Sequence, residues 1–161
     1  MIHPGGASYT LRRVPDTPFR VERLSAPGES DAAELARLVP QLSASSRVNL
    51  ETLRAITENP HTALLVARAS DGSIVGTLTL ATFAIPTGVR AWIEDVVVDE
   101  GIRGQGIGAA LVEAALEHAA DLGARTVDLT SRPSREDANR LYVRLGFARR
   151  ETNVYRFSLE D

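Results

Sequence analysis

A glycine-rich loop at 101–108 carries residue types that are suited to binding chemistry. It lies between an apolar strand-like run and an amphipathic helical run, so a helix is expected to begin directly after it. No Ser, Thr, Asp or Asn occurs in the loop to cap the helix that follows. A helix start leaves about four backbone N–H groups unpaired and carries the positive end of the helix dipole. Because glycine has no Cβ, a phosphate can approach these donors closely, and Arg103 adds a bidentate donor. The loop therefore predicts an anion site.

Two nucleotide-binding patterns compete for this loop. A P-loop needs a Gly-Lys-Ser/Thr sequence, and the chain contains no lysine, since all 18 basic residues are arginine. The Rossmann fingerprint is nominally met by Gly104, Gly106 and Ala109, with Asp128 placed for a ribose. However, only about 30 residues follow Asp128, too few for the further βα units of a dinucleotide fold. A flexible glycine loop without a ligand is the third alternative.

Composition limits the broad class of the protein. A length of 161 residues fits one domain, and 43% hydrophobic with 24% charged residues is typical of a globular chain. We expect a flexible lead-in over 1–18, without a secretory signal, and a single domain over 19–161. No apolar run approaches a membrane span. The arginine-only bias suggests a GC-rich bacterial genome, and we expect a cytoplasmic protein.

Charge and metal-ligand counts exclude further classes. The net charge of -3 argues against a general nucleic-acid binder. With no cysteine and three scattered histidines, the sequence predicts no metal site and no thiolate nucleophile. The predicted chemistry therefore depends on carboxylates, tyrosine, arginine and backbone groups.

The spacing of apolar residues predicts a mixed α/β (α+β) chain. We expect strands over 19–24, 61–68, 74–83, 92–98 and 126–130, and two short strands within 147–159. Helices are expected over 31–42, 49–59, 107–122 and 134–146. Candidate helix caps are Asp31, Asn49 and Ser134. An antiparallel start is thus followed by a βαβ unit near 92–130.

Two motifs give this order of elements a family resemblance. The segment from Arg103 to Gly108 resembles the Q/R-x-x-G-x-G/A acetyl-CoA signature of the GNAT superfamily of N-acyltransferases, and 93–98 is similar to that family's fourth strand. The segment 138–147 resembles its second motif, A/N-x-x-x-Y-x-x-x-G-F. The motifs lie about 35 residues apart with a helix and a strand between them. The order of the elements resembles that of the family over about 19–160, and the sequence-specific resemblance lies within 92–150.

The resemblance implies a splayed, mostly antiparallel sheet of about seven strands flanked by about four helices. Acetyl-CoA would be the co-substrate, lying between the fourth and fifth strands and needing no metal. Main-chain groups of the fourth strand would pair with the pantetheine arm, and backbone N–H groups of the loop would hold the pyrophosphate. The residues so assigned are Val96, Val97, Val98, Arg103, Gly104, Gln105, Gly106, Ile107, Gly108, Ala109, Ser131, Asn139, Tyr142 and Arg144.

Acetyl transfer to an amine needs a neutral amine and a protonated or hydrogen-bonded leaving thiolate. The resemblance assigns Tyr142 as the proton donor to the CoA sulfur. Glu94 falls on a position that several members use for a base or to hold water, while Trp92 occupies another catalytic position of the family. Asp95 or a water chain are alternatives to Glu94. Uninterrupted alternation predicts that 94, 96 and 98 share one face of the strand.

These observations predict an N-acetyltransferase that moves an acetyl group from acetyl-CoA directly to a primary amine of a small molecule or protein. We expect a pocket for the amine acceptor in 42–59 and 83–90, with no nucleic acid or membrane as a partner. The resemblance also allows a homodimer, although no residue specifies its interface. The alternative is a non-catalytic acyl-CoA-binding or regulatory domain.

Overall fold

The computed structural model describes residues 18–42 and 46–159, and its contacts form two compact units, Met1–Thr130 and Ser131–Asp161. The first unit contains a five-stranded sheet in the sequential order β1 (Phe19–Arg23), β2 (Thr62–Ala69), β3 (Ile74–Ile85), β4 (Gly88–Val98) and β5 (Ala124–Asp128). All pairs are antiparallel except β4 with β5, which are parallel. The mixed α/β fold class is therefore confirmed.

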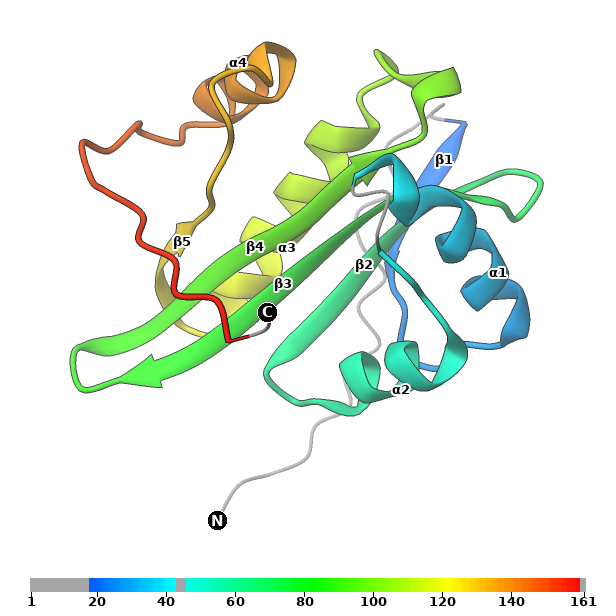
Figure 1. Ribbon diagram of the computed structural model, residues 1–161, viewed down its shortest axis with the longest axis horizontal. Coiled ribbons are helices and arrows are strands. Elements are labelled where there is room, and N and C mark those ends of the chain that lie inside the picture. Colours follow the sequence, from blue (N-terminus) through cyan, green and yellow to red (C-terminus); the bar gives the residue numbers. More distant parts are fainter. Residues whose placement is uncertain (1–17, 43–45, 160–161) are drawn as a thin grey trace. The chain divides into compact units, whose positions relative to one another are not determined.

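Helices cover both faces of the sheet (Figure 1). On one face lie α1 (Glu29–Leu38), the 3-10 turn η1 (Val39–Gln41) and α2 (Leu50–Glu58). On the other face lies α3 (Ile107–Asp121), which follows the 3-10 turn η2 (Glu100–Ile102) and leads into the parallel strand β5. The second unit contains α4 (Glu136–Arg144). Asn49 caps α2 as expected, its side-chain oxygen accepting from the Thr52 N–H at 2.8 Å.

The expected strand count was wrong, because the described residues form five strands rather than about seven. The two short strands expected within 147–159 are absent from the ladder pairings of the described residues. Alternation of apolar residues produces a strand only where a neighbouring edge pairs with the backbone. Four apolar side chains of this segment are 71–92% exposed: Val154, Tyr155, Phe157 and Leu159.

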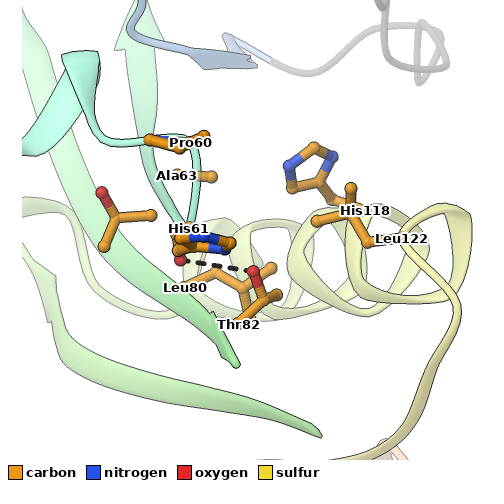
Figure 2. Close-up of a pocket in the computed structure, with 8 residues that line it drawn as sticks. Pro60, His61, Ala63, Leu80, Thr82, His118 and Leu122 are labelled. Atoms are coloured by element: carbon orange, nitrogen blue, oxygen red, sulfur yellow. Dashed lines mark hydrogen bonds between the residues drawn. The ribbon is translucent and has the colours of Figure 1, made fainter. Parts of the chain in front are cut away.

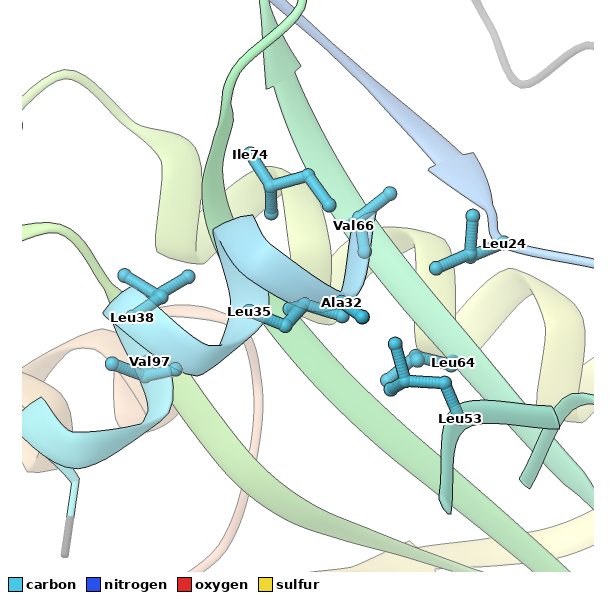
Figure 3. Close-up of a cluster of buried hydrophobic side chains, with 9 residues drawn as sticks. All are labelled: Leu24, Ala32, Leu35, Leu38, Leu53, Leu64, Val66, Ile74 and Val97. Atoms are coloured by element: carbon cyan, nitrogen blue, oxygen red, sulfur yellow. The ribbon is translucent and has the colours of Figure 1, made fainter. Parts of the chain in front are cut away.

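Two layers of apolar contacts hold the first unit together. Between the sheet and the first two helices, a buried cluster forms from Leu24, Ala32, Leu35, Leu38, Leu53, Leu64, Val66, Ile74 and Val97 (Figure 3). On the opposite face, Gly76 of β3 lets the first turn of α3 approach closely. A Cβ there would lie 2.9 Å from Ile107 Cγ2 and 3.1 Å from Leu111 Cδ1. The helix that follows the glycine loop is thereby fixed against the sheet.

A half-buried ion-pair network joins α1 to β1 and β2. Arg68 donates to Glu22 at 2.8 Å and to Asp31 at 2.9 Å, and the Arg68 side chain is 16% exposed. Asp31 was expected to cap α1, but the helix begins two residues earlier with Gly28 as its N-cap. The Asp31 carboxylate instead accepts from the Gly28 N–H at 2.9 Å, which is the return half of a capping box.

Replacing Asp31 with asparagine is expected to lower the free energy of unfolding at neutral pH by about 1–3 kcal/mol, because Arg68 loses a charged partner. Burial opposes ionisation of Asp31, but hydrogen bonds from Gly28 and Arg68 outweigh it and hold the pKa of Asp31 below its usual value. This stabilisation is present above about pH 4 and is lost as the pH falls through the lower folded pKa. Urea unfolding of both proteins between pH 7 and pH 3 should show the difference shrinking below pH 4. A pH-independent difference would contradict the assignment.

Candidate functional site

A β-bulge interrupts β4 in the segment expected to carry catalytic carboxylates. Thr77 of β3 pairs with Val97, and Thr79 pairs with Glu94, so two steps along β3 correspond to three along β4. Asp95 supplies the extra residue and has a positive φ of 53°. Aspartate is among the few non-glycine residues that adopt this left-handed conformation readily. The polar pair Glu94-Asp95 inside an apolar strand is the sequence signal for this bulge.

The bulge changes which side chains share a face of the strand. Uninterrupted alternation was wrong here, because Glu94 shares its face with Val97 and not with Val96 and Val98. Val97 packs in the buried cluster under α1, while the Glu94 side chain lies exposed further along the same face. The Trp92 indole N–H donates to Glu94 Oε1 at 2.8 Å. This hydrogen bond orients Oε1 of Glu94 and leaves the other oxygen of that carboxylate able to accept a proton.

The bulged part of β4 also has an open edge. Pairing between β4 and β5 ends at Trp92 and Asp128, whereas β4 continues to Val98. Within the described residues no strand therefore pairs with 93–98 on the side facing β5. An extended group with amide-like donors and acceptors can pair there as an added strand does. The half-buried side chains of Val96 and Val98 flank this edge.

Two glycines set the backbone path of the glycine loop. Gly104 and Gly106 have φ of 83° and 81°, so each turns the chain through the left-handed region. Gly106 is the N-cap of α3 and provides no side-chain hydrogen bond. The N–H groups of the first helical residues, Ile107, Gly108 and Ala109, have no partner within the helix. Ile107 is 2% exposed and fixed in the core, so it contributes backbone only.

The polar side chains of the loop, Arg103 and Gln105, are both exposed. Arg103 is 60% exposed and pairs with Glu100 at 3.3 Å, a contact of low expected strength. Gln105 is exposed. Both therefore remain available to a phosphate ligand, while the backbone N–H groups are the fixed part of the site.

In the second unit, Gly146 explains why the motif ends in Gly-Phe. Its φ of 91° ends α4, with the Gly146 N–H donating to the Val143 carbonyl and the Phe147 N–H to the Tyr142 carbonyl, each at 3.0 Å. These two bonds form a Schellman motif. The chain reversal brings the Phe147 ring against Tyr142, with centroids 5.8 Å apart at 64°. Desolvation raises the pKa of Tyr142 against an opposing effect of Arg135, so the phenol stays protonated at neutral pH.

Three further residues of this unit were predicted to contact CoA. The Asn139 side chain donates to the Arg132 carbonyl at 2.9 Å, so one of its donors already fixes the loop before α4. The Ser131 hydroxyl is buried and has no hydrogen-bond partner among the described residues. Arg144 is exposed on α4.

No group of three or more histidine, aspartate or glutamate residues in 18–42 and 46–159 is arranged to hold a metal ion. His61 and His118 line a cavity of about 10 Å³ with Thr82 and Leu122 (Figure 2), room for about one water molecule. Burial lowers the pKa of His118, reinforced by Arg23. His3 lies outside the described residues. No helix among the described residues is long and apolar enough to cross a membrane.

Comparison with known sequences identifies the family. The sequence model of the acetyltransferase (GNAT) family matches residues 31–147, more than half of the chain, and the chain belongs to that family. An uncharacterized N-acetyltransferase of Methanocaldococcus jannaschii is 41% identical over 61 residues. That stretch is 38% of this chain and 27% of the relative, so the match spans about a quarter of the relative's length.

Solved structures agree with this fold. An acetyltransferase of Trypanosoma brucei superimposes with a TM-score of 0.73 and 27% identity, covering 88% of this chain and 99% of that chain. An aminoglycoside acetyltransferase from an uncultured soil metagenomic sample gives a TM-score of 0.79, covering 90% of this chain and 99% of its own, at 22% identity. The second likeness concerns the fold alone.

Proposed function

We propose that this protein transfers the acetyl group of acetyl-CoA directly to a primary amine within a ternary complex. The observation that carries the proposal is the uncapped N-terminus of α3, preceded by two left-handed glycines and by a strand with an open edge. The coenzyme's pyrophosphate suits the free N–H donors, and its pantetheine amides suit the open edge of β4. The family membership supports this assignment of the ligand.

The residues present fit that coenzyme. Val96, Val97 and Val98 would supply main-chain groups to the pantetheine arm, and the segment from Arg103 to Ala109 would surround the pyrophosphate. In the second unit, the unpaired Ser131 hydroxyl and the free oxygen of Asn139 are further candidates, and Arg144 suits a phosphate.

The chemistry requires three proton movements. Glu94, directly or through a water, would take a proton from the acceptor ammonium, whose pKa of about 10.4 keeps it charged at neutral pH. The amine lone pair then attacks the thioester carbonyl carbon. The tetrahedral intermediate collapses with cleavage of the carbon–sulfur bond, and the Tyr142 hydroxyl gives its proton to the departing sulfur. The nitrogen, which is still cationic after the attack, gives its extra proton to the resulting tyrosinate, so the products are a neutral amide, a thiol and a restored Tyr142. The raised pKa of Tyr142 keeps that proton in place until it is needed.

The test is thiol release from acetyl-CoA with a panel of primary amines and N-terminal peptides, together with calorimetric titration of acetyl-CoA. We expect binding and amine-dependent thiol release. Tight binding without turnover on any acceptor would favour a non-catalytic acyl-CoA-binding domain. No binding of acetyl-CoA would overturn both assignments.

Replacing Gly106 with alanine is expected to weaken acetyl-CoA binding by about 10-fold or more, since a left-handed alanine costs about 1–2 kcal/mol and relaxes the loop away from the anion geometry. Gly72 provides a matched control: it has φ of 91° in the β2–β3 turn, and nothing lies within 4 Å of its missing Cβ, as at Gly106. Gly72→Ala should lower the free energy of unfolding to a similar extent without changing acetyl-CoA affinity. Equal affinities for both variants would contradict the role of Gly106.

A further inference from the structure

The segment that leads into the glycine loop is held by two side chains that lie about 60 residues earlier in the sequence, Arg37 and Gln41. Arg37, in the last turn of α1, donates through Nη1 to Asp99 Oδ2 at 2.5 Å and through Nη2 to the Ile74 carbonyl at 3.1 Å. Asp99 directly follows β4, and its other carboxylate oxygen accepts from the Gly101 N–H at 3.0 Å. One aspartate therefore ties both the helix and the turn η2 to the end of the strand.

A second tie comes from the η1 turn. Gln41 accepts, through its side-chain oxygen Oε1, a hydrogen bond from the Glu100 N–H at 3.1 Å. The backbone N–H of Asp99 donates to the Val75 carbonyl at 2.9 Å, and the Ile102 N–H donates to the Asp99 carbonyl at 3.1 Å. Residues 99–102 are thus fixed through side chain and backbone alike, immediately before the two glycines that give the loop its shape.

We propose that Arg37 and Gln41 are positioning residues for the coenzyme loop, setting the path of η2 so that Gly104, Gly106 and the N-terminus of α3 are ready for the pyrophosphate. The inference rests on the proposed function. Neither residue is assigned to touch the coenzyme, so both act through Asp99 and Glu100. Glycine loses more backbone freedom on ordering than other residues, and a loop held in advance loses less of it when a ligand binds.

The electrostatics of the tie agree with its geometry. The hydrogen bond from Arg37 lowers the pKa of Asp99, with further help from the Gly101 N–H, and the same contact raises the pKa of Arg37. The Arg37 side chain is 47% exposed, so the pair contributes little to the stability of the fold. Its expected effect is therefore on the ligand affinity of the loop rather than on unfolding.

The experiment compares Arg37→Met and Gln41→Met with Asp31→Asn, which breaks an ion pair on the same helix but does not touch the loop. Each full-length variant is measured for acetyl-CoA Kd by calorimetry, for kcat and KM, and for Tm. We expect Kd and KM for acetyl-CoA to rise by about 3- to 10-fold in each methionine variant, the range that corresponds to one hydrogen bond. At saturating acetyl-CoA, the kcat of each methionine variant should stay within about two-fold of the wild-type kcat. Asp31→Asn should lower Tm and leave Kd unchanged.

A double-mutant cycle isolates the charged contact. Arg37→Met combined with Asp99→Asn should raise Kd by less than the product of the two single effects, because both remove the same interaction. If the wild type binds acetyl-CoA and the Kd is unchanged in Arg37→Met and Gln41→Met, this inference is overturned while the proposed function stands. An equal rise of Kd in Asp31→Asn would also overturn the inference, because the effect would then come from a general loss of stability. Failure of the wild type to bind acetyl-CoA would overturn the proposed function and the inference together.

Discussion

Replacing Tyr142 with phenylalanine is expected to lower kcat by about 10²-fold or more, the usual contribution of general acid catalysis, while the Kd for acetyl-CoA barely changes. The reason is the leaving group: without the hydroxyl, the sulfur departs as a thiolate with no proton donor. The ring remains, so its edge contact with Phe147 and the end of α4 should be preserved. Single-turnover thiol release at saturating acetyl-CoA measures the chemical step directly.

Tyr155→Phe is the matched control for that substitution. It removes the same hydroxyl from a tyrosine of the same unit that is 88% exposed and has no assigned role. Its kcat should stay at the wild-type value. Unchanged single-turnover rates in Tyr142→Phe would remove Tyr142 from the mechanism.

Replacing Glu94 with glutamine is expected to lower kcat/KM for the acceptor amine by about 10²-fold, because glutamine cannot take the ammonium proton. Glutamine still offers a carbonyl oxygen to the Trp92 indole N–H, so the hydrogen bond seen at 2.8 Å can persist. Acetyl-CoA affinity should be unaffected. The initial rate with the amine well below its KM and acetyl-CoA saturating, followed from pH 6 to pH 9.5, measures the effect.

The loss in Glu94→Gln should diminish toward high pH, where a larger fraction of the amine is neutral without help. Glu113→Gln, on the exposed side of α3, is the control and should behave as the wild type at every pH. A rate loss that is constant across the pH range would argue that Glu94 has an electrostatic or structural role instead of accepting a proton.

Local features of the fold could be predicted from the sequence with good accuracy. The cap at Asn49, the end of α4 at Gly146 and the long helix starting at Ile107 appear where expected. Each depends on residues within one turn of each other, since capping, left-handed glycine and helical periodicity are short-range effects. The absence of a capping side chain in the glycine loop was likewise visible in the sequence.

Features that depend on pairing between distant residues were not predictable in this way. Alternation placed Glu94 with Val96 and Val98, whereas the bulge at Asp95 places it with Val97. The alternating segment at 147–159 was expected to form strands, but a strand exists only where a second backbone pairs with it.

The sequence by itself thus determined the motifs, the cap of α2, the end of α4 and the chemical character of the loop, while the expected caps at Asp31 and Ser134 were wrong. The tertiary structure decided the face of β4 on which Glu94 lies, the edge of β4 that stays open, and the ties from Arg37 and Gln41, which join residues 62 and 59 positions apart. The physical reason is range. Helix caps and glycine turns form between neighbours in the chain, whereas strand register and the anchoring of a loop depend on contacts that the rest of the fold must first bring together.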